Sequence, residues 1–117
     1  MFKLQAESHP NVTVLRYKGD MCLPDVAQLT KELEGYLFAP NVRQVVLDLS
    51  AVGKVDTSGL GVLVSVNTKG CSMRRRLVLL KPAPHVCDLL RKVEIEGFFA
   101  TFDSEDELKG YIPDTAD

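Results

Sequence analysis

The sequence predicts an α/β fold in which one mixed sheet of about four to five strands packs with about four helices. Apolar and polar residues alternate over residues 2–17, which is typical of a strand hairpin. After residue 20, short apolar runs of strand length alternate with segments whose apolar residues recur every three or four positions, the period of a helix. Strands separated by helices pair in parallel, whereas a hairpin is antiparallel, so we expect both kinds of pairing.

The chain is expected to open as strand, strand, helix. The two strands are predicted over 2–6 and 12–17, on either side of the turn residues 9–11, His-Pro-Asn. A helix is predicted over 23–37, because five apolar residues recur there at three- and four-residue spacing and Pro24 is tolerated in a first turn. This helix is therefore amphipathic.

The two middle strands are expected to be covered on both faces. Residues 45–49, Val-Val-Leu-Asp-Leu, and residues 77–80, Leu-Val-Leu-Leu, are nearly continuous apolar runs of strand length. After the first run, residues from 50 onward are predicted to form a loop that leads into a helix starting near Ser58. After the second run, apolar residues spaced over 86–93 predict a third amphipathic helix.

The last part of the chain contains two weaker patterns. Residues 97–99, Gly-Phe-Phe, are predicted to form a short last strand. Ser104 followed three residues later by Glu107 is a capping-box pattern, which predicts a short final helix through Leu108. Residues 113–117 are expected to be a frayed tail.

Length and composition predict a single domain over residues 1–117 in the cytoplasm. A chain of 117 residues with 45% hydrophobic residues buries a core without disulfides or a metal. The three cysteines are neither an even set nor a close pair, which favours a reducing compartment. No secretory signal or membrane-spanning stretch is visible. The formal net charge of -2 disfavours nucleic acid as a partner, and without a Walker-type loop no cofactor is expected.

Residues 56–61, Asp-Thr-Ser-Gly-Leu-Gly, form the candidate site. They place two hydroxyls where a buried strand passes into a helix, which is where open α/β sheets commonly bind ligands and partners. The first turn of a helix has unpaired N–H groups and partial positive charge, so a phosphate on Ser58 gains about 0.3 to 1 kcal/mol there. Gly59 and Gly61 lack side chains beside Ser58, which lets another protein approach closely.

A structural interpretation of the same residues stays open at this point. Asp, Thr and Ser are preferred capping residues, so one of Asp56, Thr57 and Ser58 can have a purely structural role as the cap of the helix. The loss of such a cap lowers stability by about 1 kcal/mol. The two histidines, His9 and His85, have no sequence neighbours that suggest a metal set or a catalytic triad.

The run from Val45 to Leu63, VVLDLSAVGKVDTSGLGVL, resembles the signature region of STAS domains of the anti-sigma factor antagonist type. That motif is a buried strand, a loop, and then Asp, Ser or Thr, Ser, Gly, Leu or Ile, Gly, and the sequence matches every position. The order of elements over residues 2–112 is also similar. The resemblance implies a STAS-like fold in which Ser58 is the residue that is phosphorylated. Thr57 is the second, less favoured candidate.

The resemblance also implies a partner-binding surface and a switch. Asp56 is similar to the aspartate that supports the phosphorylation site, and Gly19-Asp20 resembles a Gly-Asp/Glu pair near the same surface. The unmodified domain is expected to bind an anti-sigma factor serine kinase, which holds the ATP, and to be released when Ser58 is phosphorylated. It is not expected to be an enzyme. The implied partner-binding residues are Asp20, Asp56, Thr57, Ser58, Gly59, Leu60 and Gly61.

Two other functions are alternatives to this one. A small STAS subunit that docks on an ABC transporter ATPase in lipid trafficking uses the same fold and the same Thr57-Ser58 face. A hydrolase with Ser58 as its nucleophile is disfavoured because Asp56-Thr57-Ser58-Gly59 lacks the leading glycine of a G-x-S-x-G elbow.

Overall fold

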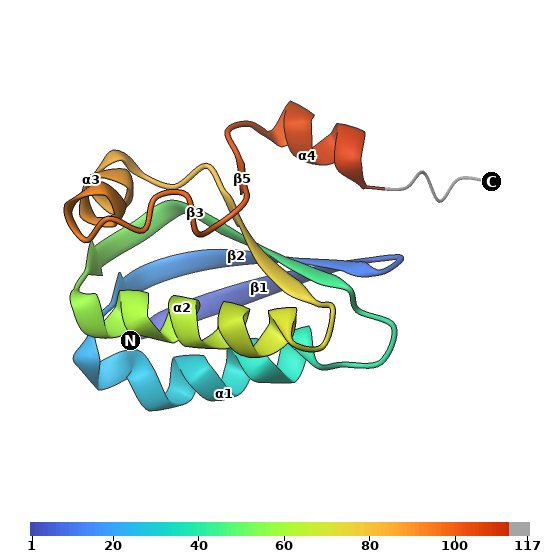
Figure 1. The fold of residues 1–117 in the computed structure, drawn as a ribbon, viewed down its shortest axis with the longest axis horizontal. Helices are drawn as coiled ribbons and strands as arrows, with labels where there is room; N and C mark the ends of the chain where they lie inside the picture. The colour runs from blue at the N-terminus through green and yellow to red at the C-terminus, as the bar shows by residue number, and fades with distance from the viewer. Residues whose placement is uncertain (113–117) are drawn as a thin grey trace.

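The computed structural model describes residues 1–112, and its centre is a five-stranded sheet in the order β1-β2-β3-β4-β5 (Figure 1). β1 and β2 pair antiparallel, and each following pair is parallel. Within residues 1–112, four α-helices accompany the sheet, so the predicted mixed sheet with about four helices is confirmed. The strands are β1 Phe2–His9, β2 Val12–Met21, β3 Gln44–Val55, β4 Arg76–Leu80 and β5 Thr101–Phe102.

The helices cover the sheet unequally. α1 and α2 lie side by side over one face, and α4 lies against part of the other face (Figure 1). The helix predicted over 23–37 is divided into a 3-10 turn, η1, and α1. Within residues 1–112, no helix combines the length and apolar composition that crossing a membrane requires. The helical elements are η1 Leu23–Asp25, α1 Val26–Leu37, α2 Thr57–Cys71, α3 Pro84–Lys92 and α4 Glu105–Tyr111.

The first half of β3, residues 45–49, is buried on both faces, as its apolar run predicts. Val45, Leu47 and Leu49 belong to the main core with the inner faces of α1 and α2. Val46 points the other way, into a second cluster that includes Leu108 of α4. Because successive side chains of a strand point to opposite faces, a strand covered on both sides needs an apolar residue at nearly every position.

The predicted loop after residue 49 is wrong, because β3 continues to Val55. Its second half pairs with the end of β2, where Ala51 lies opposite Lys18 and Val55 opposite Met21. This pairing joins residues more than 30 positions apart in the chain, and the local sequence carries no apolar run there to indicate it. The extension carries the start of α2 to the far tip of the sheet.

The last strand also differs from its prediction. β5 consists of Thr101 and Phe102, and the preceding aromatic pair forms a turn in which Phe99 is buried and Phe98 exposed. β5 forms at these two residues because their backbone pairs with that of β4. Next to this pairing, the Lys81 N–H donates to the Phe102 carbonyl at 2.8 Å. The tail predicted at 113–117 lies outside the described residues.

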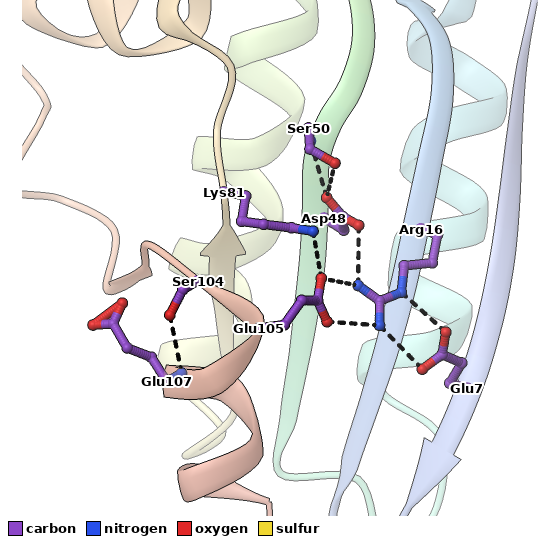
Figure 2. Close-up of polar contacts among 8 residues, drawn as sticks. All are labelled: Glu7, Arg16, Asp48, Ser50, Lys81, Ser104, Glu105 and Glu107. Atoms are coloured by element: carbon purple, nitrogen blue, oxygen red, sulfur yellow. Dashed lines mark hydrogen bonds and ion pairs between the residues drawn. The ribbon is translucent and has the colours of Figure 1, made fainter.

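Arg16 joins four elements on the face of the sheet that α4 covers (Figure 2). From β2, its guanidinium donates to Glu7 of β1 at 2.9 Å, to Asp48 of β3 at 3.0 Å and to Glu105 of α4 at 2.8 Å. The hydrogen bonds that Arg16 donates, to Glu7 first and then to Glu105, raise the pKa of Arg16. Bonds from Arg16 and then Lys81 lower the pKa of Glu105. The cluster therefore fixes the first turn of α4 onto the sheet.

Glu105→Gln is expected to destabilise the protein by about 0.5 to 1 kcal/mol at neutral pH, since its ion pairs are partly exposed. Because the pKa of Glu105 is lowered by folding, its contribution is present above the ordinary glutamate pKa and is lost as the pH falls through the folded value. Urea unfolding at pH 7 and at pH 3 measures this difference.

Asp106→Asn is the matched control, because it removes the same charge from the same turn of α4 without breaking an ion pair of residues 1–112. Equal losses for the two variants at pH 7 would contradict the role given to the Arg16 cluster.

Candidate functional site

Asp56 holds together the elements that meet at the tip of β3. It is the N-cap of α2, where its Oδ1 accepts from the Gly59 N–H at 2.8 Å. Its Oδ2 accepts from the Leu23 N–H of η1 at 3.0 Å. These backbone bonds, that of Gly59 foremost, lower the pKa of Asp56, so the carboxylate stays ionised at neutral pH. The capping interpretation is therefore right for Asp56, which also ties α2 to η1.

Thr57 and Ser58 form the first two positions of α2, beyond the cap. Thr57 is exposed and Ser58 is partly buried. Among residues 1–112, neither hydroxyl has a hydrogen-bond partner, because Asp56 performs the capping. Both hydroxyls are thus chemically available beside the positive end of the helix dipole.

The three residues that follow divide into inward and outward positions. A Cβ on Gly59 would lie 2.0 Å from the Met21 carbonyl oxygen, so glycine is required for α2 to pack against the end of β2. Leu60 is only 3% exposed and belongs to the core. A Cβ on Gly61 would meet nothing within 4 Å. Of the two glycines expected to admit another protein, Gly61 alone faces open space.

Asp20 is the penultimate residue of the neighbouring strand β2. Gly19 has a φ of +112°, a conformation that favours glycine, and it turns the chain so that Asp20 is exposed. The Asp20 Oδ1 accepts from the Lys54 N–H of β3 at 2.8 Å, two residues before Asp56. The structure thus brings the Gly-Asp pair and the 56–61 motif together, with one carboxylate at the end of β2 and the other at the start of α2.

An open apolar groove runs beside the outward residues of α2, and sequence reasoning missed it. The segment after α3 forms its other wall through Val93 and Ile95. Leu23, which the helical pattern assigned to an apolar inner face, is instead 65% exposed. The two walls of the groove come from segments about 35 residues apart in the chain, so no local sequence pattern indicates the groove. Its lining residues are Thr57, Leu60, Gly61, Val64, Ser65, Val93 and Ile95.

His85 lies at the start of α3 and contacts the last part of β3, three residues before Asp56. Its Nε2 lies 2.6 Å from the Gly53 carbonyl oxygen, so that nitrogen is engaged by the backbone. In the part of the chain that the structure describes, no three His, Cys, Asp or Glu side chains are grouped to hold a metal ion.

Comparison with known proteins assigns this arrangement to a family. The STAS domain model matches residues 3–108, which is most of the chain. The chain belongs to the STAS domain family. The family predicted from residues 45–63 is thereby confirmed, and Asp20 and Asp56 both lie within the matched region.

Solved STAS structures share this fold at low sequence identity. The anti-sigma factor antagonist SpoIIAA in its unphosphorylated form has 18% identity and a TM-score of 0.75, over 93% of this chain and 96% of that one. Phosphorylated SpoIIAA of Bacillus has 17% identity and a TM-score of 0.71, over 93% and 99%. An anti-sigma factor antagonist from Mycobacterium paratuberculosis has 18% identity and a TM-score of 0.80, over 97% and 96%.

Substitution of the two motif glycines by alanine is expected to have opposite effects on this STAS domain. Gly59→Ala forces a Cβ against the Met21 carbonyl and is expected to lower the free energy of unfolding by about 1 to 3 kcal/mol. Gly61→Ala places a Cβ in open space on a helix and is expected to raise the free energy of unfolding by about 0.4 to 1 kcal/mol. Chemical denaturation of both variants measures the difference, and equal effects would contradict the inward and outward assignment.

Proposed function

We propose that this STAS domain is an anti-sigma factor antagonist of a partner-switching pathway. In its unphosphorylated state it binds an anti-sigma factor that is also a serine kinase, and phosphorylation of Ser58 by that kinase releases it. The observation that carries the proposal is the position of Ser58: its hydroxyl stands unengaged by residues 1–112 at the start of α2, beside an apolar groove.

The surface around Ser58 suits a protein partner. Thr57 and Gly61 face outward on α2, and the groove beside them is mainly apolar. Leu23, held near this point by its bond to Asp56, adds a large exposed apolar side chain. Exposed apolar surface gathered in one place is typical of an interaction site, because a partner removes it from water.

A phosphate on Ser58 changes this surface far more than it changes the fold. It adds about 1.5 to 2 negative charges at neutral pH. The helix dipole stabilises such a group by about 0.3 to 1 kcal/mol, so the folded domain tolerates it. A partner covering the groove, by contrast, has to desolvate the new charge next to the carboxylates of Asp20 and Asp56. SpoIIAA, whose fold this chain shares, is known in both unphosphorylated and phosphorylated forms.

In this proposal the chain itself performs no catalysis and acts in the cytoplasm. ATP is bound by the kinase, and the antagonist supplies only the hydroxyl that accepts the phosphate. A hydrolytic role for Ser58 is not supported, because among residues 1–112 its hydroxyl makes no hydrogen bond to a histidine, and His85 instead contacts the Gly53 carbonyl.

Ser58→Asp is expected to weaken binding to the kinase at least about tenfold, equal to about 1.4 kcal/mol, because it places a fixed charge in the interface. The partner is first captured from the native host with Ser58→Ala as bait, and its affinity for each variant is then measured by calorimetry. Thr57→Ala adds no charge and is expected to weaken binding less than Ser58→Asp does.

Ser72→Asp is the matched control, since it adds the same charge at the opposite end of α2. Equal weakening by Ser58→Asp and Ser72→Asp would contradict a local effect at Ser58. Capture of a transporter ATPase in place of an anti-sigma factor kinase would replace the proposal by the docking-subunit function.

A further inference from the structure

Four arginines line an open pocket at the opposite end of the sheet from Ser58. Arg43 precedes β3, Arg76 begins β4, and Ser58 follows the far end of β3. β3 contains 12 residues, so at about 3.3 Å per residue the two places are roughly 35 Å apart. The pocket is therefore separate from the surface described above. Its lining residues are Arg43, Gln44, Cys71, Arg74, Arg75 and Arg76.

One of the four arginines has a structural role. Arg75 donates from Nη1 to the carbonyl oxygens of Leu37 at 2.7 Å and Ala39 at 2.8 Å, which are among the last carbonyls of the α1 region. Its guanidinium also lies 5.9 Å from the centre of the Phe38 ring. Arg75 thereby fixes the end of α1. The groups that its guanidinium contacts among residues 1–112 are all neutral.

The other three guanidiniums face solvent around the pocket. Arg43, Arg74 and Arg76 are exposed, and no ion pair within residues 1–112 includes any of them. Arg76 is oriented by a neutral group, since its Nε lies 3.0 Å from the Gln44 amide when that amide is turned to accept. Arg74 sits in a turn with a φ of +60°, between α2 and β4.

This concentration of positive charge contrasts with the chain as a whole, whose net charge is -2. Arg16 and Arg91 both contact carboxylates, so unmatched arginine is not general in this protein. Four guanidiniums around one pocket repel one another, and an anion between them removes that repulsion. The pocket therefore favours an anionic ligand.

The number of guanidiniums selects the kind of anion. A single guanidinium fork satisfies the two oxygens and single charge of a carboxylate. A phosphate group carries nearly two charges and at least three oxygens that accept hydrogen bonds, so it uses several forks at once. We propose that the pocket binds a phosphate group, carried either by a soluble phosphorylated molecule or by a lipid headgroup.

Pyrophosphate is the first probe, with acetate at equal ionic strength as the reference anion. Pyrophosphate is expected to raise the melting temperature of the full chain saturably, and acetate is not. The double variant Arg43→Gln/Arg74→Gln is expected to bind pyrophosphate at least about tenfold more weakly, because two forks are lost. Arg91→Gln, which removes an arginine near the other end of the molecule, is expected to bind as the wild type does.

The double variant also separates lost binding from lost folding. It relieves repulsion between exposed like charges, so without ligand it is expected to melt no lower than the wild type. Equal effects of pyrophosphate and acetate would overturn the proposal, as would undiminished binding by the double variant.

Two further probes identify the source of the phosphate. Retention on phosphatidylcholine vesicles containing phosphatidic acid, lost in the double variant and reversed by inorganic phosphate, would support a lipid headgroup as the ligand. Pyrophosphate binding without vesicle retention would support a soluble ligand. Poly-glutamate that binds as tightly as pyrophosphate would overturn the assignment to phosphate and indicate an acidic protein segment.

Discussion

The two hydrogen bonds accepted by the Asp56 carboxylate are the interactions on which the proposed partner-binding surface depends. One oxygen fixes the Gly59 N–H at the start of α2, and the other fixes the Leu23 N–H of η1. Because those elements follow different strands, one ionised side chain sets the position of both. Ser58 lies inside the turn that Asp56 caps, so its hydroxyl is presented at a defined place instead of on a loose loop.

The same short motif divides its residues between folding and recognition. Gly59 and Leu60 hold α2 against the end of β2 and the core, where any added bulk has to displace backbone. Thr57, Ser58 and Gly61 face outward, where a change in charge or size alters the surface while the packing stays as it is. In the proposed function, a phosphate added there acts on binding more than on folding. At the opposite end of the sheet, where β3 and β4 begin, the surface is instead rich in arginine.

Most of the fold was predictable because its elements are encoded locally. The alternation in the first strands, the helical spacing, and the buried run at 45–49 each lie within one short segment. The extension of β3 to Val55 was not predictable, since it depends on pairing with residues of β2 far away in the chain. The groove beside α2 was missed for the same reason, as its walls come from residues near 60 and near 95. The exposure of Leu23 follows from the 3-10 turn that replaces the first helical turn there.

The central claim is that Ser58 receives the phosphate, and the most direct measurement is fragment mass spectrometry of the protein purified from its own host. Wild type, Ser58→Ala and Thr57→Ala are compared across growth conditions, with attention to the fragment from Val55 to Lys69. The account predicts added phosphate on that fragment in the wild type and in Thr57→Ala, and none in Ser58→Ala. Phosphate that persists in Ser58→Ala, or its absence from the wild type under every condition, would contradict the account.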